Sequence, residues 1–124
     1  MNKHRPKHLA LHLIKLPPSG IVSILHRISG LLLFLALPLL LLMLQYSLRS
    51  IETYTQLMDV LAHPLSKLAL IGLSWAFLHH FCAGLRYLAI DLHYFSNLAQ
   101  SRASSKWVLA VSLAMTAFLG VKLW

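Results

Sequence analysis

The chain has 124 residues, of which 58% are hydrophobic and only 11% are charged, and its mean hydropathy is +0.70. Soluble domains carry about 25% charged residues, so this composition excludes an ordinary soluble globule. The net charge of +8 does not indicate a nucleic-acid partner, because such binding needs a solvated basic face and too little of this chain is polar. One cysteine, Cys82, excludes an internal disulfide. We therefore predict a small, basic, integral membrane protein.

Three runs without Asp, Glu, Lys or Arg predict membrane-spanning helices. They cover 28–48, 68–85 and 107–121. A bilayer core about 30 Å thick needs about 20 helical residues, so the first two runs suffice, and the third does if Lys122 snorkels to the interface. Helices are expected because open strands leave backbone groups unpaired in lipid. The prediction is an all-α membrane protein with an N-terminal segment over 1–19 and a three-helix membrane anchor over 20–124, with helices at about 21–49, 65–91 and 106–124.

The basic residues outside the spans predict the orientation of the chain. The N-terminus and the second loop lie on one side and hold seven Lys or Arg, against three on the other side. By the positive-inside rule the N-terminus is predicted to be cytoplasmic. The N-terminal stretch has neither the cleavage site of a signal peptide nor the Ser-rich form of a mitochondrial transit peptide. A bacterial inner membrane fits these features best.

A polar cluster lies at the start of the first predicted span. Ser23 and Arg27 are four residues apart and His26 is three from Ser23, so all three share one helix face. Ionisable groups in a span are costly and therefore candidates for function. A hydroxyl, an imidazole and a guanidinium together suit a ligand with carbonyl or carboxylate oxygens. In the alternative, Arg27 reaches lipid phosphates and His26 caps a neighbouring loop.

The second polar cluster lies deeper, on the second span. His79 and His80 are roughly 15 Å or more from either end of a helix over 65–90. Gly84 follows His80 by one turn and leaves room for a flat ligand beside the backbone, and axial haem ligation in a helical bundle needs such room. Asp91 is eleven residues after His80 and lies on about the same side of the helix. His79 points about 100° away, so at most one of the two histidines faces a given partner. The alternative is a buried histidine hydrogen-bonded to another helix.

Other residues carry weaker indications. His4, His8 and His12 are spaced by four, as in a metal site, but interleaved Pro and Lys favour a solvated tail. Pro38 is expected to kink the first helix. The residues expected mostly at the membrane interfaces are His63, His93, Trp75, Tyr87, Tyr94, Trp107 and Trp124.

Two motifs resemble the cytochrome b membrane subunit of succinate dehydrogenase. The first comprises Arg5-Pro6, Lys15-Leu16-Pro17 and Ser23-Ile24-Leu25-His26-Arg27-Ile28-Ser29-Gly30. In the second, His80 is followed after three residues by Gly84-Leu85-Arg86 and then by Asp91. Both occur in the family's order, in a chain of the expected length and number of spans. Pro18 and Tyr87 depart from the family pattern, and Tyr87 removes one candidate partner for a haem propionate.

The resemblance implies an anchor of complex II, which links the tricarboxylic acid cycle to the respiratory chain. A flavoprotein subunit oxidises succinate there, and an iron–sulfur subunit passes the electrons to quinone, here ubiquinone by resemblance. By the same resemblance Ser23 and Arg27 line the quinone pocket, His80 is an axial ligand of haem b, and His26 with Arg27 faces the haem propionates. One usable histidine cannot hold a bis-His haem alone. The second ligand is therefore expected from a smaller anchor subunit, and this chain forms half of a two-chain helical bundle.

Two alternatives remain open at the level of the sequence. One is the anchor of a fumarate reductase, which runs the reaction in reverse. The other is a structural membrane protein that docks a soluble partner through its basic N-terminus, with His80 and Arg27 as buried polar contacts. In every case membrane lipid is an expected partner, and the chain itself is expected to contain no catalytic residue.

Overall fold

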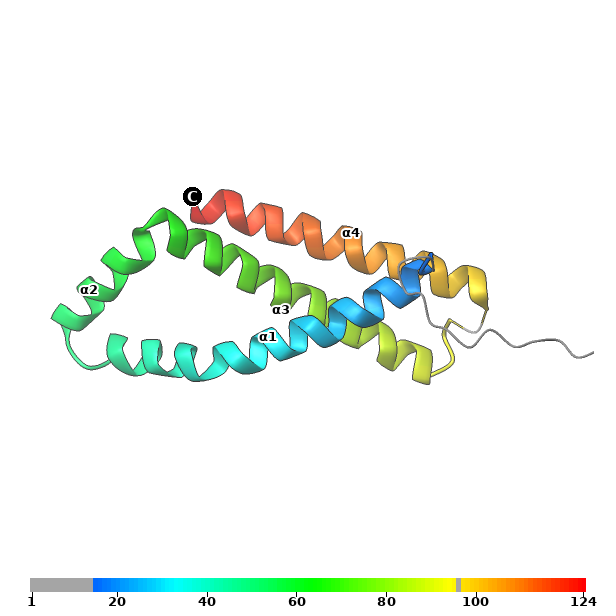
Figure 1. Cartoon of the computed structure of the whole chain (residues 1–124), viewed down its shortest axis with the longest axis horizontal. Helices are drawn as coiled ribbons and strands as arrows, with labels where there is room; N and C mark the ends of the chain where they lie inside the picture. The colour runs from blue at the N-terminus through cyan, green and yellow to red at the C-terminus, as the bar shows by residue number, and fades with distance from the viewer. Residues whose placement is uncertain (1–14, 96) are drawn as a thin grey trace, which may run out of the picture.

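The structure of the chain, a computed structural model, describes residues 15–95 and 97–124. Within these residues the chain forms four helices and no strand: α1 (Pro18–Ser47), α2 (Ile51–Ala62), α3 (Pro64–Asp91) and α4 (Leu98–Leu123) (Figure 1). The helices α1, α3 and α4 have 30, 28 and 26 residues and are apolar enough to cross a membrane. The predicted all-α membrane fold with three long helices is confirmed.

The first helix begins where proline chemistry predicts. Pro17 is its N-cap residue and Pro18 occupies the first helical position, where a fixed φ helps and the missing N–H costs nothing. Pro38 lies inside α1, which continues to Ser47 and bends along its length (Figure 1). Proline removes one hydrogen bond of the helix and so favours such a bend.

A helix that the sequence analysis did not predict connects α1 and α3. Residues 51–62 were assigned to a loop, but they form α2. The N–H of Thr53 donates to Ser50 Oγ at 3.1 Å, and the N–H of Ser50 donates to Thr53 Oγ1 at 3.0 Å. This reciprocal pair is a capping box with threonine in place of the usual Glu or Gln. The local hydrogen bonds explain why α2 begins at Ile51.

The last helix begins eight residues before its predicted start at 106. Asn97 is the N-cap of α4, and its Oδ1 accepts from the Gln100 N–H at 2.8 Å. The span was predicted from the uncharged run over 107–121, and this run does not include the polar first turns of the helix. The prediction of 106–124 was therefore too short at its N-terminal end.

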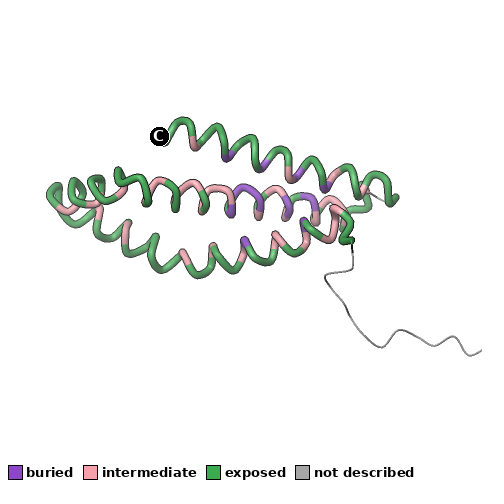
Figure 2. Tube along the Cα trace, turned by 45° about the horizontal axis from the view of Figure 1, so that its top comes forward, coloured by how far each residue is buried: buried purple, intermediate pink, exposed green. Residues whose placement is uncertain are grey.

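The three long helices pack with α3 between α1 and α4. Figure 2 shows the buried residues gathered on α3 and on the facing sides of its neighbours. Leucines such as Leu35, Leu39 and Leu42 on α1 are exposed, as expected for side chains that face lipid or another chain. The buried apolar core is small and consists of Val22, Ala76, Leu78, Ala83 and Val108.

A buried arginine joins α3 to α4. Arg86 is only 6% exposed. Its Nε donates to Ser104 Oγ at 3.0 Å, and its Nη2 donates to Ser101 Oγ at 3.0 Å and to the Ser101 carbonyl at 3.1 Å. The serines at the start of α4 therefore accept the hydrogen bonds of the arginine that directly follows the second uncharged run. Arg86 belongs to the second sequence motif, and the sequence alone indicates no structural role for it.

We expect Ser50→Ala to destabilise the first turn of α2 by about 1 kcal/mol, because the Thr53 N–H loses its side-chain acceptor. Amide hydrogen exchange of residues 51–55 in detergent should become about fivefold faster. The matched control is Ser47→Ala, since the Ser47 hydroxyl only donates to the carbonyl of Leu44 in its own helix. Equal exchange in the two variants would contradict the capping assignment.

Candidate functional site

The packing of α1 against α3 brings together two of the four predicted site residues. His26 on α1 and His80 on α3 stack with their ring centroids 4.2 Å apart and their planes within 7°. Both rings are half-buried, so each remains accessible from outside the chain. Ser23 is half-buried and Arg27 is exposed, both on α1.

The imidazole of His80 is held by the backbone of α1. Its Nδ1 lies 3.1 Å from the His26 carbonyl oxygen and 3.4 Å from Ser29 Oγ, which itself donates to that carbonyl at 2.9 Å. A carbonyl oxygen only accepts, so the bond to His26 requires the proton on Nδ1. The neutral ring then has its free lone pair on Nε2. This is the common arrangement of a metal-ligating histidine, whose other N–H donates to a carbonyl.

The close approach of His80 to α1 depends on Gly30. A Cβ atom built on Gly30 would lie 2.9 Å from His80 Cε1 and 3.2 Å from its Nδ1. Any larger residue would therefore push the ring away from the His26 carbonyl. Sequence reasoning quoted Gly30 in a motif but gave it no role. The available signal was the small Ser29-Gly30 pair in an otherwise bulky span.

The second glycine of the site faces His26. A Cβ atom on Gly84 would lie 3.8 Å from His26 Nε2, so this imidazole borders the space that the sequence analysis reserved for a flat ligand. Tyr87 also packs against His26, with ring centroids 5.2 Å apart. Tyr87 is half-buried here, and its predicted place in an interfacial belt stays a prediction.

The neighbouring histidine has a different environment. The His79 side chain is 0% exposed and stacks on Trp75 with centroids 5.4 Å apart. Neither of its ring nitrogens has a hydrogen-bond partner among the residues that the structure describes. His79 is thus enclosed by helices of its own chain. Trp75 was expected at an interface, but it is half-buried and packs on His79.

The remaining predicted residues divide between the ends of the helices and the undescribed tail. His63 caps α3, with its Nδ1 accepting from the Leu65 N–H at 3.2 Å. Residues 15–95 and 97–124 contain no group of three or more His, Cys, Asp or Glu that could hold a metal ion. Tyr94, Trp107, Trp124 and His93 are exposed. The histidines at 4, 8 and 12 lie outside the described residues.

The sequence as a whole matches a known family of membrane subunits. The family is described as "Succinate dehydrogenase/Fumarate reductase transmembrane subunit", and its sequence profile matches residues 1–119. The chain belongs to this family. A succinate dehydrogenase cytochrome b556 subunit of Coxiella burnetii is 38% identical over 125 aligned residues, which cover the whole of both chains.

More distant relatives carry the same name. The succinate dehydrogenase cytochrome b556 subunit of Rickettsia felis is 30% identical, with 94% of this chain and 91% of the relative covered. That of Paracoccus denitrificans is also 30% identical, with 90% and 86% covered. The resemblance inferred from the two motifs is confirmed. This transmembrane subunit is therefore a multi-pass membrane protein of the succinate dehydrogenase and fumarate reductase family.

In this transmembrane subunit we expect Gly30→Ala to lower stability by about 1–3 kcal/mol, because the new methyl group overlaps the His80 ring. Gly72→Ala is the control, since nothing lies within 4 Å of a Cβ atom at that position. Alanine also favours a helix over glycine by roughly 0.5–1 kcal/mol, so the control should be neutral or stabilising. Thermal unfolding in detergent measures both. Equal tolerance at the two positions would contradict the close contact.

Proposed function

We propose that this transmembrane subunit is one of two anchor chains of a succinate dehydrogenase, where it binds haem b with a second anchor chain and helps to form a quinone site. The observation that carries the proposal is the hydrogen bond of His80 Nδ1 to the His26 carbonyl. This bond leaves Nε2 as a neutral ligand nitrogen. The printed name of the relatives, cytochrome b556, supports a b-type haem.

The residues of the α1–α3 contact fit the haem. Nε2 of His80 would ligate the iron, while His26 and Arg27 would face the propionates. When bound, a haem b supplies one-electron transfer. His79 is enclosed within its own chain, which supports His80 as the single ligand that this chain offers. The second axial ligand would then come from the smaller anchor subunit.

Ser23 and Arg27 are proposed to bind the quinone. They lie one turn apart on α1, and neither side chain has a hydrogen-bond partner within 15–95 and 97–124. The Ser23 hydroxyl and the Arg27 guanidinium can donate to quinone carbonyl oxygens, where negative charge develops on reduction. Neither group is a good acid at neutral pH, so the protons would come from a partner residue or from water.

The basic end of the bundle is proposed to meet the extrinsic subunits. The N-terminal end of α1 lies at the same end of the molecule as the link between α3 and α4 (Figure 1). Lys15, Arg27, Arg102 and Lys106 are exposed there. By the positive-inside rule this end is proposed to lie on the cytoplasmic side, with the chain in a bacterial inner membrane. The iron–sulfur subunit, followed by the flavoprotein subunit, would dock on this side.

Two alternatives differ from this proposal in testable ways. The family description covers fumarate reductases as well, and an anchor of that kind would use the same contacts with electrons flowing in the opposite direction. A purely structural anchor would use His80 and Arg27 only as packing groups. Substitutions at His80 and Arg27 separate a redox role of this subunit from a structural one.

Replacing His80 by Ala removes the proposed ligand nitrogen. We expect the b-type band in the reduced-minus-oxidised spectrum of the assembled complex to fall by about tenfold or more. His79→Ala is the neighbouring control and should keep the band per assembled complex, whatever the yield of that complex. An unchanged band in His80→Ala would exclude this residue as an axial ligand.

Replacing Arg27 by Leu removes the proposed charge at the quinone. Quinone reduction by succinate should fall by about tenfold or more, because a donor to the developing negative charge is lost. Succinate oxidation by a soluble artificial acceptor should persist, because the flavin lies in another subunit. Arg49→Leu makes the same charge change at an exposed position beyond the other end of α1 and should affect neither activity. Loss of both activities in Arg27→Leu would indicate a structural role.

A further inference from the structure

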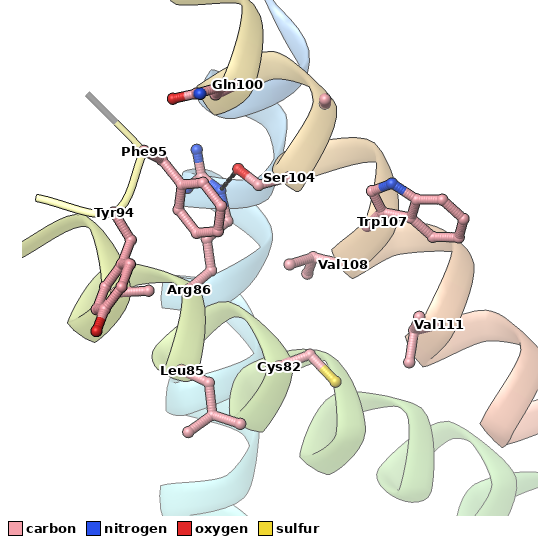
Figure 3. A pocket seen from close by; sticks show the side chains of 12 residues that line it. Cys82, Leu85, Arg86, Tyr94, Phe95, Gln100, Ser104, Trp107, Val108 and Val111 are labelled. Carbon is pink, nitrogen blue, oxygen red and sulfur yellow. Dashed lines mark hydrogen bonds between the residues drawn. The ribbon is translucent and has the colours of Figure 1, made fainter. Parts of the chain in front are cut away.

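A groove of about 580 Å³ lies between α3 and α4, apart from the His26–His80 contact. Its floor is formed largely by apolar side chains, including Cys82, Leu85, Val108 and Val111 (Figure 3). A cavity of roughly 300–1,000 Å³ with an apolar lining and a few polar groups is typical of a site for a small ligand. The proposed haem and quinone contacts use none of these side chains.

The groove and the histidine contact face different directions. At about 100° per residue, the positions of Cys82, Leu85 and Ala89 on α3 are turned by about 140–200° from that of His80. A second anchor chain that shares a haem at His80 would therefore approach the opposite side of α3. The groove is left on the side of this chain that faces away from that contact.

One end of the groove holds the guanidinium group of Arg86, which is positively charged and has hydrogen-bond donors that are not used within the part of the chain that the structure describes. The three acceptors of Arg86 are neutral oxygens of Ser101 and Ser104, bonded to its Nε and Nη2. Its Nη1 group has no acceptor among residues 15–95 and 97–124. Arg86 lines the groove, and Figure 3 shows its guanidinium group at the end formed by Gln100 and Ser104. This end is suited to an anionic oxygen.

The charged end of the groove lies near the membrane surface. Arg86 is five residues from the end of α3, which corresponds to about 8 Å along the axis. Tyr94 and Trp107 are exposed at the rim, as aromatic side chains are at the level of lipid headgroups. From Ser104 the groove follows α4 to Val111, seven residues or about 10 Å toward the bilayer centre.

We propose that this groove binds an anionic phospholipid, with the phosphate at Arg86 and an acyl chain along α4 toward Val111. The occupant must combine negative charge at headgroup depth with an apolar chain that extends inward. A phospholipid of the surrounding bilayer has both features in this order. A quinone tail would leave the charge of Arg86 uncompensated, and so would a helix of another subunit that brings no acidic side chain to it.

The test uses the complex assembled with its partner subunits, equilibrated in mild detergent with phosphatidylglycerol or phosphatidylcholine, and native mass spectrometry of the bound molecules. Phosphatidylglycerol should be retained about fivefold more strongly than phosphatidylcholine, since one arginine near the surface favours an acidic lipid by about this factor. Ala103→Phe adds a large side chain to the lining of the groove and leaves Arg86, Ser101 and Ser104 unchanged, and it should reduce the retained phosphatidylglycerol by about fivefold or more.

Ala117→Phe is the matched control on the same helix, because Ala117 is exposed and does not line the groove. It should leave lipid retention unchanged. Arg86→Gln removes the positive charge together with part of the hydrogen bonding to Ser101 and Ser104, and it should abolish the preference for phosphatidylglycerol. Equal retention of the two lipids by the unmodified complex would overturn the proposal. The proposal would also be overturned if Ala103→Phe retained as much phosphatidylglycerol as the unmodified complex, or if it lost a quinone or a subunit and kept the lipid.

Discussion

The contact between the His80 ring and the backbone of α1 governs the rest of the arrangement. Gly30 allows the ring to come within van der Waals distance of α1, and this approach brings Nδ1 to the His26 carbonyl. The same hydrogen bond determines which nitrogen carries the proton and keeps the two imidazoles stacked. Helix packing and the position of the proton on His80 therefore have one cause, the absence of a side chain at position 30.

The spans could be predicted from the sequence, because lipid imposes strong constraints, and the same constraints select the candidate site residues. About 20 apolar residues are needed to cross the bilayer, and an ionisable group within such a run needs a reason to be there. These two rules were enough to select His26, Arg27 and His80. The choice of His80 over His79 rested on Gly84. In the structure it is supported by a different feature, the complete enclosure of His79.

The features that could not be predicted depend on local hydrogen bonds or on which side chains meet. The helix α2 was missed because Thr53 completes its capping box in place of an acid or amide. Trp75 and Tyr87 each pack on a histidine, and the general rule that places aromatic residues at interfaces does not predict such contacts. Such pairings follow from the rotation of each helix about its axis, and the hydropathy of a span carries little information about that rotation.

The bonds between Arg86 and α4 also have a consequence for the biosynthesis of the chain. The serine acceptors of Arg86 follow it by 15 and 18 residues, so α3 is made before the groups that satisfy its guanidinium. Until Ser101 and Ser104 have been made, the guanidinium of Arg86 can be satisfied only by water or by lipid headgroups, which its position near the end of α3 allows. The final packing of α3 therefore waits for the turn that follows it and for the first turns of α4.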